Sequence, residues 1–141
     1  MKLFKYISVI LLSVLCCCSC GLVKEANTYT DRLDEIQKIT IVELLEYDSD
    51  TYTYSEKQLR EVLDVNVFMD EMLALKCDSN WGDPQQLQIG DVVIKLVYDN
   101  GDFDLINWRA QIKRRSGTNR YGYMIFDEKE FDLLLSKYLN E

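Results

Sequence analysis

The sequence predicts an α+β domain, in which a mainly antiparallel sheet of about four strands carries two amphipathic helices on one face, in the order β-α-β-β-β-α. Two observations support this prediction. Apolar residues alternate with polar ones on both sides of a turn at Asp99–Asp102, which is typical of a β-hairpin. Two helix-capping patterns, at Ser55 and Asp127, are each followed by apolar residues at helical spacing.

The first strand is predicted over residues 35–47. Ile39 and Ile41 belong to one alternating set and Val42 and Leu44 to the other, so both faces are apolar and we expect the strand to be covered on both sides. Asp48-Ser49-Asp50 then predicts a turn. The sequence leaves open whether residues 35–54 form one strand or two.

The first helix is predicted to begin at Ser55, because Ser55-Glu56-Lys57-Gln58 matches a capping box. Apolar residues continue at helical spacing to about Leu75. Residues 64–67 include weaker helix formers, so a break or kink is expected there.

The clearest hairpin joins a strand over residues 89–98 to the strand that follows. The apolar set of the first strand is Val92, Ile94, Leu96 and Tyr98, and that of the second is Ile106, Trp108, Ala110 and Ile112. A two-residue Asn-Gly turn would place these sets on opposite faces, whereas an odd-numbered loop places them on one. The sequence therefore predicts a three-residue loop over residues 99–101, with Gly101 left-handed.

The end of the chain predicts a turn, a strand and a helix. Ser116-Gly117-Thr118-Asn119 is the turn, and the aromatic residues over 120–126 indicate a third strand of the meander. The capping pattern at Asp127 begins a helix whose apolar face carries Phe131, Leu134, Leu135 and Tyr138.

A basic stripe is the candidate partner-binding site. The outer face of the strand after the hairpin carries Arg109, Gln111, Lys113 and Arg115, with Trp81 in a neighbouring loop as a rim. If the helices cover the other face, this stripe lies on the open face of the sheet. Arginine and lysine suit an anionic partner such as a wall polymer, a lipid headgroup or an acidic protein patch. The alternative is a solvated sheet face balanced by cross-strand acids such as Asp91.

The first twenty residues predict an export signal. Lys2 and Lys5 precede an apolar run over residues 7–15, and small residues follow. The run is too short for a bilayer-spanning helix, which needs about 20 apolar residues.

This segment resembles the signal peptides of bacterial lipoproteins, in which a cysteine becomes lipidated and forms the mature N-terminus. Cys17-Cys18-Ser19-Cys20 carries the resemblance and makes Cys20 the preferred lipid-anchor residue, while Leu15-Cys16-Cys17-Cys18 offers Cys18 as a second register. The resemblance implies residues 1–20 as the signal. Residues 21–34 are polar and lack a convincing period, which predicts a tether, and the length of residues 35–141 predicts a single domain. The resemblance also implies an extracytoplasmic location, held to the membrane by the lipid alone.

The layout of the domain, with an export signal before it, is also similar to small lipoprotein domains of unknown function in Gram-positive bacteria. The motifs that match are the helix start at Ser55, the hairpin at residues 98–101 and the strand-helix end at residues 123–138. This resemblance implies no activity and no catalytic residues.

Composition restricts the function classes. The net charge of −8 argues against general nucleic-acid binding, which depends on basic surface. The chain has no histidine, which excludes Ser-His and Cys-His nucleophile pairs and histidine-based zinc sites. Asp99, Asp102 and Asp104 lack the spacing of a calcium loop and are explained as turn formers. We expect no metal and no cofactor.

The sequence therefore predicts a non-enzymatic, lipid-anchored extracytoplasmic domain that binds an envelope protein or an anionic surface polymer, with no role in nucleic-acid binding. The alternative is a small inhibitor or immunity-like protein that acts on an exported enzyme, because net acidity suits a basic target.

Overall fold

The computed structural model describes residues 30–76, 86–122 and 126–140. Residues Leu33–Glu141 form one compact unit. Its six strands form one sheet in the order β2-β1-β3-β4-β5-β6, and every neighbouring pair is antiparallel. The elements are η2 (Thr30–Glu35), β1 (Ile36–Asp48), β2 (Thr53–Val62), α2 (Val65–Leu73), β3 (Val92–Tyr98), β4 (Phe103–Ile106), β5 (Gln111–Arg115), β6 (Thr118–Gly122) and α3 (Glu128–Asn140). The α+β class is confirmed, but the sheet has six strands rather than about four.

The two extra strands come from two segments that the sequence analysis assigned differently. The first is β2, which occupies residues predicted to begin a helix at Ser55. β2 pairs with β1 from Ile39↔Val62 to Asp48↔Thr53. The Ser55 hydroxyl accepts a hydrogen bond from the Glu46 amide at 3.1 Å, across the hairpin, instead of capping a helix. Pairing with a long apolar strand has overridden the local capping pattern.

Helix α2 begins ten residues later than predicted. Asp64 is its N-cap, and its side chain accepts a hydrogen bond from the Val67 amide at 3.0 Å. The weak helix formers over residues 64–67 therefore mark the start of the helix rather than a kink. Its buried residues are Phe68, Met69 and Met72.

The β3–β4 hairpin confirms the predicted three-residue loop. The Tyr98 amide donates to the Asp102 carbonyl at 2.9 Å, which leaves residues 99–101 as the loop. Gly101 has φ +83°, a left-handed conformation that favours glycine. The register pairs Ile94 with Ile106, as the shared apolar face requires.

The second extra strand arises because the segment predicted as one strand through Ile106 and Ile112 is a hairpin. β4 ends at Ile106, residues 107–110 turn, and β5 begins at Gln111. Asn107 stabilises this turn, since its side-chain oxygen accepts hydrogen bonds from the amides of Arg109 (3.0 Å) and Ala110 (2.8 Å). Leu105 pairs with Ile112, and Ile106 pairs with Gln111. Ile106 and Ile112 therefore lie on opposite faces of the sheet, which corrects the predicted apolar set.

The C-terminal elements follow the prediction more closely. Ser116 and Gly117, both with positive φ, make the turn between β5 and β6. β6 spans Thr118–Gly122, and residues 123–125 of the predicted strand lie outside the described residues. Asp127 accepts a hydrogen bond from the Glu130 amide at 3.1 Å and caps α3. The buried face of α3 is the predicted one, with Phe131, Leu134, Leu135 and Tyr138.

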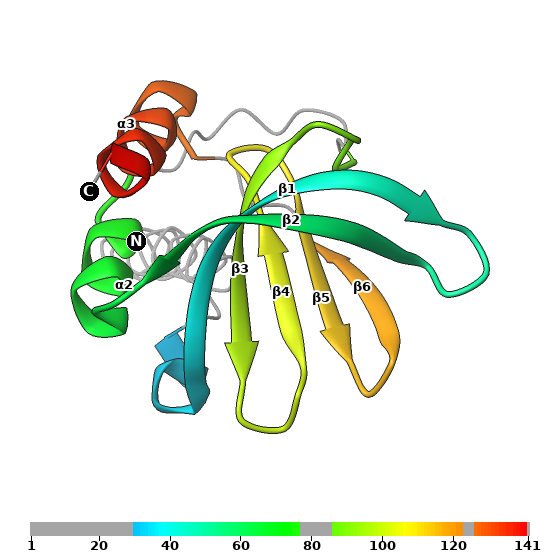
Figure 1. Cartoon of the computed structure of the whole chain (residues 1–141). Helices are drawn as coiled ribbons and strands as arrows, with labels where there is room; N and C mark the ends of the chain where they lie inside the picture. Colours follow the sequence, from blue (N-terminus) through cyan, green and yellow to red (C-terminus); the bar gives the residue numbers. More distant parts are fainter. Residues whose placement is uncertain (1–29, 77–85, 123–125, 141) are drawn as a thin grey trace, which may run out of the picture. The chain divides into compact units, whose positions relative to one another are not determined.

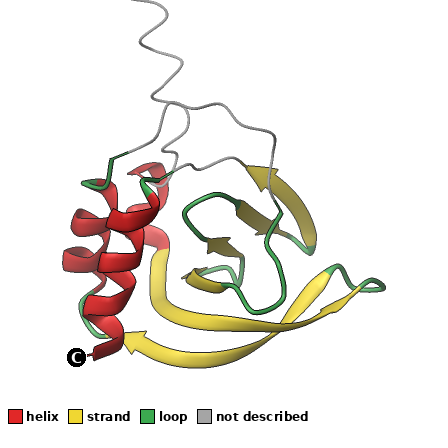
Figure 2. Cartoon of the chain, turned by 90° about the horizontal axis from the view of Figure 1, so that it is seen from above, coloured by secondary structure: helices red, strands yellow, loops and turns green. Residues whose placement is uncertain are grey.

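Both faces of the sheet are apolar at their centre. One face contributes a cluster of Val42, Leu44, Leu87, Val93, Leu105, Ala110 and Ile112. Alternate residues of the same strands, Ile39, Ile41, Ile94, Leu96 and Ile106, are fully buried on the other face. Helix α2 contacts β1, α3 contacts β2, and the rings of Phe68 and Tyr138 join the two helices at 4.7 Å. Figures 1 and 2 show the helices side by side, next to the β1–β2 hairpin.

The β1–β2 hairpin is longer than the other strands and bends across the sheet (Figures 1 and 2). Its far end reaches β5 and β6. The Asn119 side chain donates to the Tyr52 carbonyl at 2.5 Å, and Arg114 donates to the Thr51 carbonyl at 3.4 Å. The sheet is thus curled, with the end of its first hairpin held against its last two strands.

Candidate functional site

The predicted basic stripe is divided between two places in the fold. Gln111, Lys113 and Arg115 lie on one face of β5, but Arg109 lies in the turn that precedes it. The prediction of one continuous strand was wrong, and the four residues therefore do not form one row. Trp81, the predicted rim, and Cys20, the predicted anchor, lie outside the described residues.

Gln111 and Arg115 surround a buried carboxylate on β4. The Asp104 side chain is 1% exposed, and its Oδ1 is 2.6 Å from Arg115 Nη1. The Tyr98 hydroxyl donates to its Oδ2 at 2.8 Å, and Gln111 Nε2 donates to the same oxygen at 3.4 Å. Lys113 pairs with Asp104 across the strands, and burial lowers the pKa of its amine. Most of the polar groups of β5 therefore compensate an internal charge.

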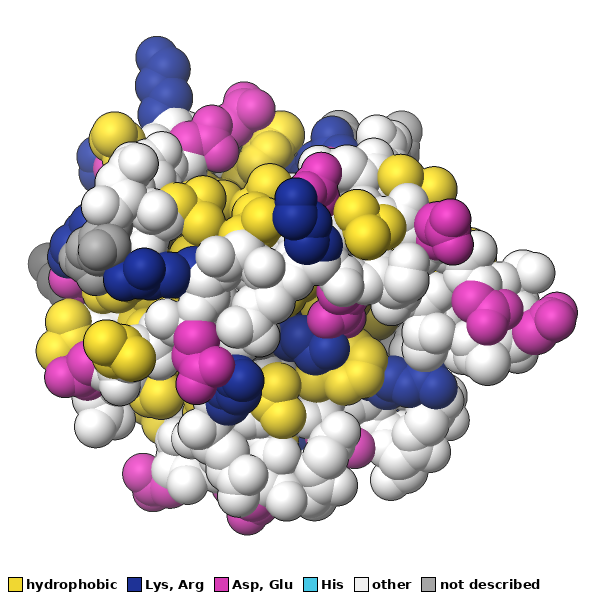
Figure 3. Space-filling view, viewed as in Figure 1, with side chains coloured by type: hydrophobic (Ala, Val, Ile, Leu, Met, Phe, Trp, Pro, Cys, Tyr) yellow, Lys and Arg dark blue, Asp and Glu magenta, His cyan; other side chains and the backbone are white. Residues whose placement is uncertain are grey.

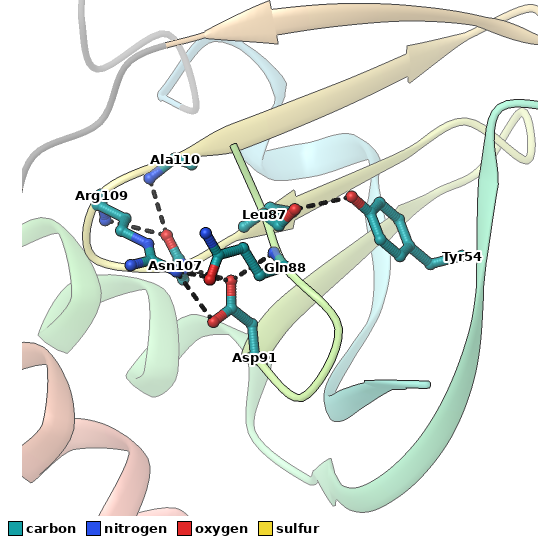
Figure 4. Close-up of polar contacts among 7 residues, drawn as sticks. All are labelled: Tyr54, Leu87, Gln88, Asp91, Asn107, Arg109 and Ala110. Atoms are coloured by element: carbon teal, nitrogen blue, oxygen red, sulfur yellow. Dashed lines mark hydrogen bonds and ion pairs between the residues drawn. The ribbon is translucent and has the colours of Figure 1, made fainter. Parts of the chain in front are cut away.

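Arg109 is engaged by a second carboxylate, Asp91, in the arrangement drawn in Figure 4. Arg109 Nη2 lies 3.2 Å from Asp91 Oδ1. Asp91 Oδ2 also accepts from the Gln88 amide at 2.8 Å and from Asn107 Nδ2 at 3.1 Å. Asp91, which was named as an acid that could balance the basic stripe, thus lies beside Arg109. This cluster ties the start of β3 to the β4–β5 turn.

These two clusters leave no continuous cationic stripe among the described residues. Figure 3 shows basic and acidic side chains interspersed over the visible face. An anionic polymer, which needs a run of available cations, has no such row on β5.

A group of exposed tyrosines lies where the end of the β1–β2 hairpin meets β6. We define the tyrosine surface as Tyr47, Tyr52 and Tyr121, whose side chains are 41%, 61% and 60% exposed. The centres of the Tyr47 and Tyr54 rings are 4.9 Å apart. Partial desolvation and the neighbouring Tyr121 raise the pKa of Tyr47. The sequence analysis did not single out these residues as a site.

Tyr52 adopts a strained backbone conformation. Its φ is +54°, in the left-handed region that a bulky side chain rarely occupies. The Tyr52 side chain in this turn is exposed to solvent. Glycine or asparagine would occupy this turn position at lower cost.

Three carboxylates lie beside the tyrosine surface. Glu46, Asp48 and Asp50 are exposed, and Figure 3 shows acidic side chains at the projecting end of the hairpin. Asp48 accepts hydrogen bonds from the Thr51 hydroxyl (2.8 Å) and from the amides of Asp50 (2.8 Å) and Thr51 (3.3 Å). These bonds lower the pKa of Asp48, so the group remains ionised at neutral and mildly acidic pH.

A groove of about 300 Å³ lies elsewhere on the sheet, over β2, β1 and β3. Its charged centre is internally paired, since Lys95 Nζ lies 2.6 Å from Glu56 Oε2 and 4.5 Å from the centre of the Phe103 ring. The groove is lined by Lys38, Thr40, Val42, Glu56, Gln58, Lys95 and Val97. A ligand there would have to compete with an ion pair that is already made.

Within residues 30–76, 86–122 and 126–140, no three acidic or cysteine side chains are grouped as a metal site. No helix in this part of the chain has the length and apolar character needed to cross a bilayer. Comparison of the chain with protein-family models, curated proteins and solved structures found no match.

Proposed function

We propose that this chain is a lipid-anchored extracytoplasmic binding module that holds another envelope protein through the tyrosine surface. The observation that carries the proposal is the exposure of Tyr47, Tyr52 and Tyr121 together at one end of a sheet whose other large aromatic residues are mostly inside. Among the described residues, Phe68, Tyr98, Phe126, Phe131 and Tyr138 are all buried.

Tyrosine is well suited to such a surface. Its ring offers a large apolar area with only two rotatable side-chain bonds, and its hydroxyl can form a hydrogen bond to a partner. Tyrosine is also enriched among the residues that contribute most to protein–protein affinity. The contact between the rings of Tyr47 and Tyr54 supports a Tyr47 ring that is held in place before a partner binds.

The placement of the module rests on the resemblance of residues 1–20 to lipoprotein signals. Cleavage before Cys20 and attachment of a diacylglycerol to its thiol through a thioether would anchor the protein, with residues 21–34 as a tether. Several acyl chains hold a protein firmly at a membrane, whereas one holds it only marginally. The anchor would confine partner search to the envelope.

Mass spectrometry of the protein from its native host tests the placement. We expect a chain that begins at Cys20 and carries a thioether-linked lipid, in the membrane fraction. A chain that begins at Met1 without lipid would contradict the anchor, and processing at Cys18 would indicate the second register.

Affinity capture from native envelopes tests the surface. We expect Tyr47→Ala and Tyr121→Ala each to reduce capture of the partner at least tenfold relative to the unmodified chain. Leu133→Ala is the matched control, because Leu133 is 70% exposed on α3, away from the tyrosine surface. Equal capture by the tyrosine variants and the control would refute the proposal.

A second candidate function is inhibition of an exported enzyme with a basic surface. The carboxylates beside the tyrosine surface favour this candidate, because charge complementarity accelerates association and suppresses wrong partners. The captured partner distinguishes the two functions. A hydrolase whose activity falls on addition of this chain would indicate an inhibitor, and a partner without such a response would indicate an adaptor.

A further inference from the structure

We infer that the partner presents lysine or arginine side chains to the tyrosine surface, so that the ligand of this site is a cationic protein segment. This inference rests on the proposed function and adds the chemistry of the partner. It follows from the charge and the side-chain chemistry at the end of the β1–β2 hairpin.

The end of this hairpin carries negative charge that the fold does not neutralise. No lysine or arginine occurs over residues 39–56, which include five carboxylates. Glu56 pairs with Lys95 at 2.6 Å, and Glu43 lies 3.9 Å from Lys57. Within the described parts of the chain, the other three, Glu46, Asp48 and Asp50, have no ion pair.

The nearest arginines do not neutralise these carboxylates. Arg114 donates its hydrogen bonds to the Thr51 carbonyl and to the Asn119 side chain. Arg120 is exposed on β6, where its register partner is Lys113 of β5. Arg114 therefore reaches this end of the hairpin, but the three carboxylates outnumber it, so the local charge remains negative.

Exposed tyrosine rings and carboxylates together form a suitable site for a cation. A guanidinium or ammonium group is attracted to the face of a tyrosine ring. A guanidinium can also donate two parallel hydrogen bonds to one carboxylate. Asp48 is held by three hydrogen bonds, so its position and charge are set before binding.

An anionic partner does not fit this surface. It would face Glu46, Asp48 and Asp50, which outnumber the arginine, Arg114, that contacts this turn, and like charges in contact oppose binding. An uncharged partner would use the rings but not the carboxylates. The cationic segment is the class that uses both.

Peptide titration of the full chain in non-ionic detergent tests the inference. The probes are two peptides of equal length, one alternating Arg with Ser and one alternating Glu with Ser. Binding is followed through the NMR signals of Tyr47, Tyr52 and Tyr121. We expect the basic peptide to bind and the acidic one not to, and we expect Kd to rise with salt concentration.

Charge-neutralising variants make the test specific. The double variant Glu46→Gln/Asp50→Asn removes two exposed charges and leaves Asp48, which stabilises the turn. We expect it to raise the Kd of the basic peptide about tenfold. The matched control, Asp70→Asn/Asp132→Asn, removes two exposed charges from the helices and should change Kd less than twofold.

The outcomes separate this inference from the proposed function. Equal affinity for the two peptides, or equal Kd for the two double variants, would overturn the cationic partner. If envelope capture still required Tyr47 in that case, the tyrosine surface would remain the binding site for a partner of another class. Capture that is indifferent to Tyr47 would instead overturn the proposed function.

Discussion

The β4–β5 hairpin and the end of the β1–β2 hairpin differ in whether their functional side chains are paired within the fold or exposed to solvent. In the β4–β5 hairpin, Arg109 forms an ion pair with Asp91 and Arg115 forms one with Asp104. These cations, which are close together in the sequence, are therefore neutralised within the fold. In the second, Tyr47, Tyr52 and Tyr121 remain exposed beside unpaired carboxylates. A charged run in the sequence can therefore serve to balance charges inside the fold, while other residues form the surface available to a partner.

The two regions also differ in what holds them together. The β4–β5 hairpin depends on buried ion pairs and on the side chain of Asn107. The end of the β1–β2 hairpin depends on exposed turn bonds to Asp48 and on contacts to β5 and β6. We therefore expect substitutions in the first region to affect mainly stability, and substitutions in the second to affect mainly binding.

The largest effect is expected from Asp104→Ala. It would leave Arg115, with a side chain only 22% exposed, without its carboxylate, and the Tyr98 hydroxyl without its acceptor. Breaking one side of a buried pair costs about 3–5 kcal/mol, so we expect the free energy of unfolding to fall by about 3 kcal/mol. Urea denaturation followed by circular dichroism measures it.

Asp99→Ala is the control for that measurement, because Asp99 is exposed in the adjoining three-residue loop. It should change the free energy of unfolding by less than about 0.5 kcal/mol. Similar losses for Asp104→Ala and Asp99→Ala would mean that the Asp104 cluster does not support the fold.

A smaller decrease in the free energy of unfolding is expected from Asp91→Ala. Its carboxylate accepts from the Gln88 amide, Asn107 and Arg109, but Asp91 is 20% exposed and water can replace part of what is lost. We expect a decrease of about 2 kcal/mol in the free energy of unfolding. A decrease as large as that for Asp104→Ala would contradict the ranking by burial.

The sequence predicted those parts of the fold in which local signals and tertiary pairing agree. The β3–β4 loop was predictable because register, turn length and Gly101 require the same geometry. Helix α3 was predictable because the cap at Asp127 and the face through Phe131 and Leu135 coincide.

The predictions from sequence were wrong where pairing with residues distant in the sequence outweighed a local pattern. Ser55 begins a good capping box, but its segment pairs with β1 over nine register positions, and the hydroxyl bonds to Glu46 instead. Alternation through Ile106 and Ile112 matched one strand, although Asn107 makes a turn between them. Asn107 is a turn-forming residue, but the strand periodicity on both sides of it outweighed that signal.

The candidate site shows the same limit. The residues of the predicted stripe were chosen by alternation, so the turn at Asn107 divided them. The tyrosine surface combines β1, the β1–β2 turn and β6, which no pattern in the sequence connects. Tyrosine is also ambiguous, because its ring favours burial and its hydroxyl favours water.

Tyr52→Gly tests whether the exposed end of the β1–β2 hairpin favours binding over stability. Glycine removes the cost of the left-handed conformation, about 1–2 kcal/mol, but loses more entropy on folding, so we expect a net gain of about 0.5–1 kcal/mol. Urea denaturation measures the gain, and envelope capture should decrease in the same variant.

Gly101→Ala is the opposite case, since it adds a side chain at φ +83°. It should destabilise the fold by about 1 kcal/mol and leave capture unchanged. If Tyr52→Gly lowered both stability and capture, Tyr52 would be a structural residue rather than a contact for a partner.

The smallest effect is expected from Glu130, at the junction of the helices and away from both hairpins. Its carboxylate accepts a hydrogen bond from the Lys76 amide at 2.9 Å, and its other oxygen lies 3.0 Å from Lys76 Nζ. These contacts lower the pKa of Glu130 and raise that of Lys76. Because the lowered pKa belongs to the folded state, the stabilisation is present above the ordinary glutamate pKa of about 4.5 and is lost as pH falls through the folded value.

The raised pKa of Lys76 has the opposite sign, so its share of the stabilisation is present below the ordinary lysine pKa of about 10.5 and is lost as pH rises through the folded value. Glu130→Gln should therefore lower Tm slightly at pH 7, and this difference should shrink as the pH falls below about 4.5 and through the folded pKa of Glu130. Both groups are solvent-accessible, so the difference at pH 7 should also shrink in high salt. A difference in Tm as large as that for Asp104→Ala would mean that pairing, rather than burial, decides what a carboxylate contributes to this fold.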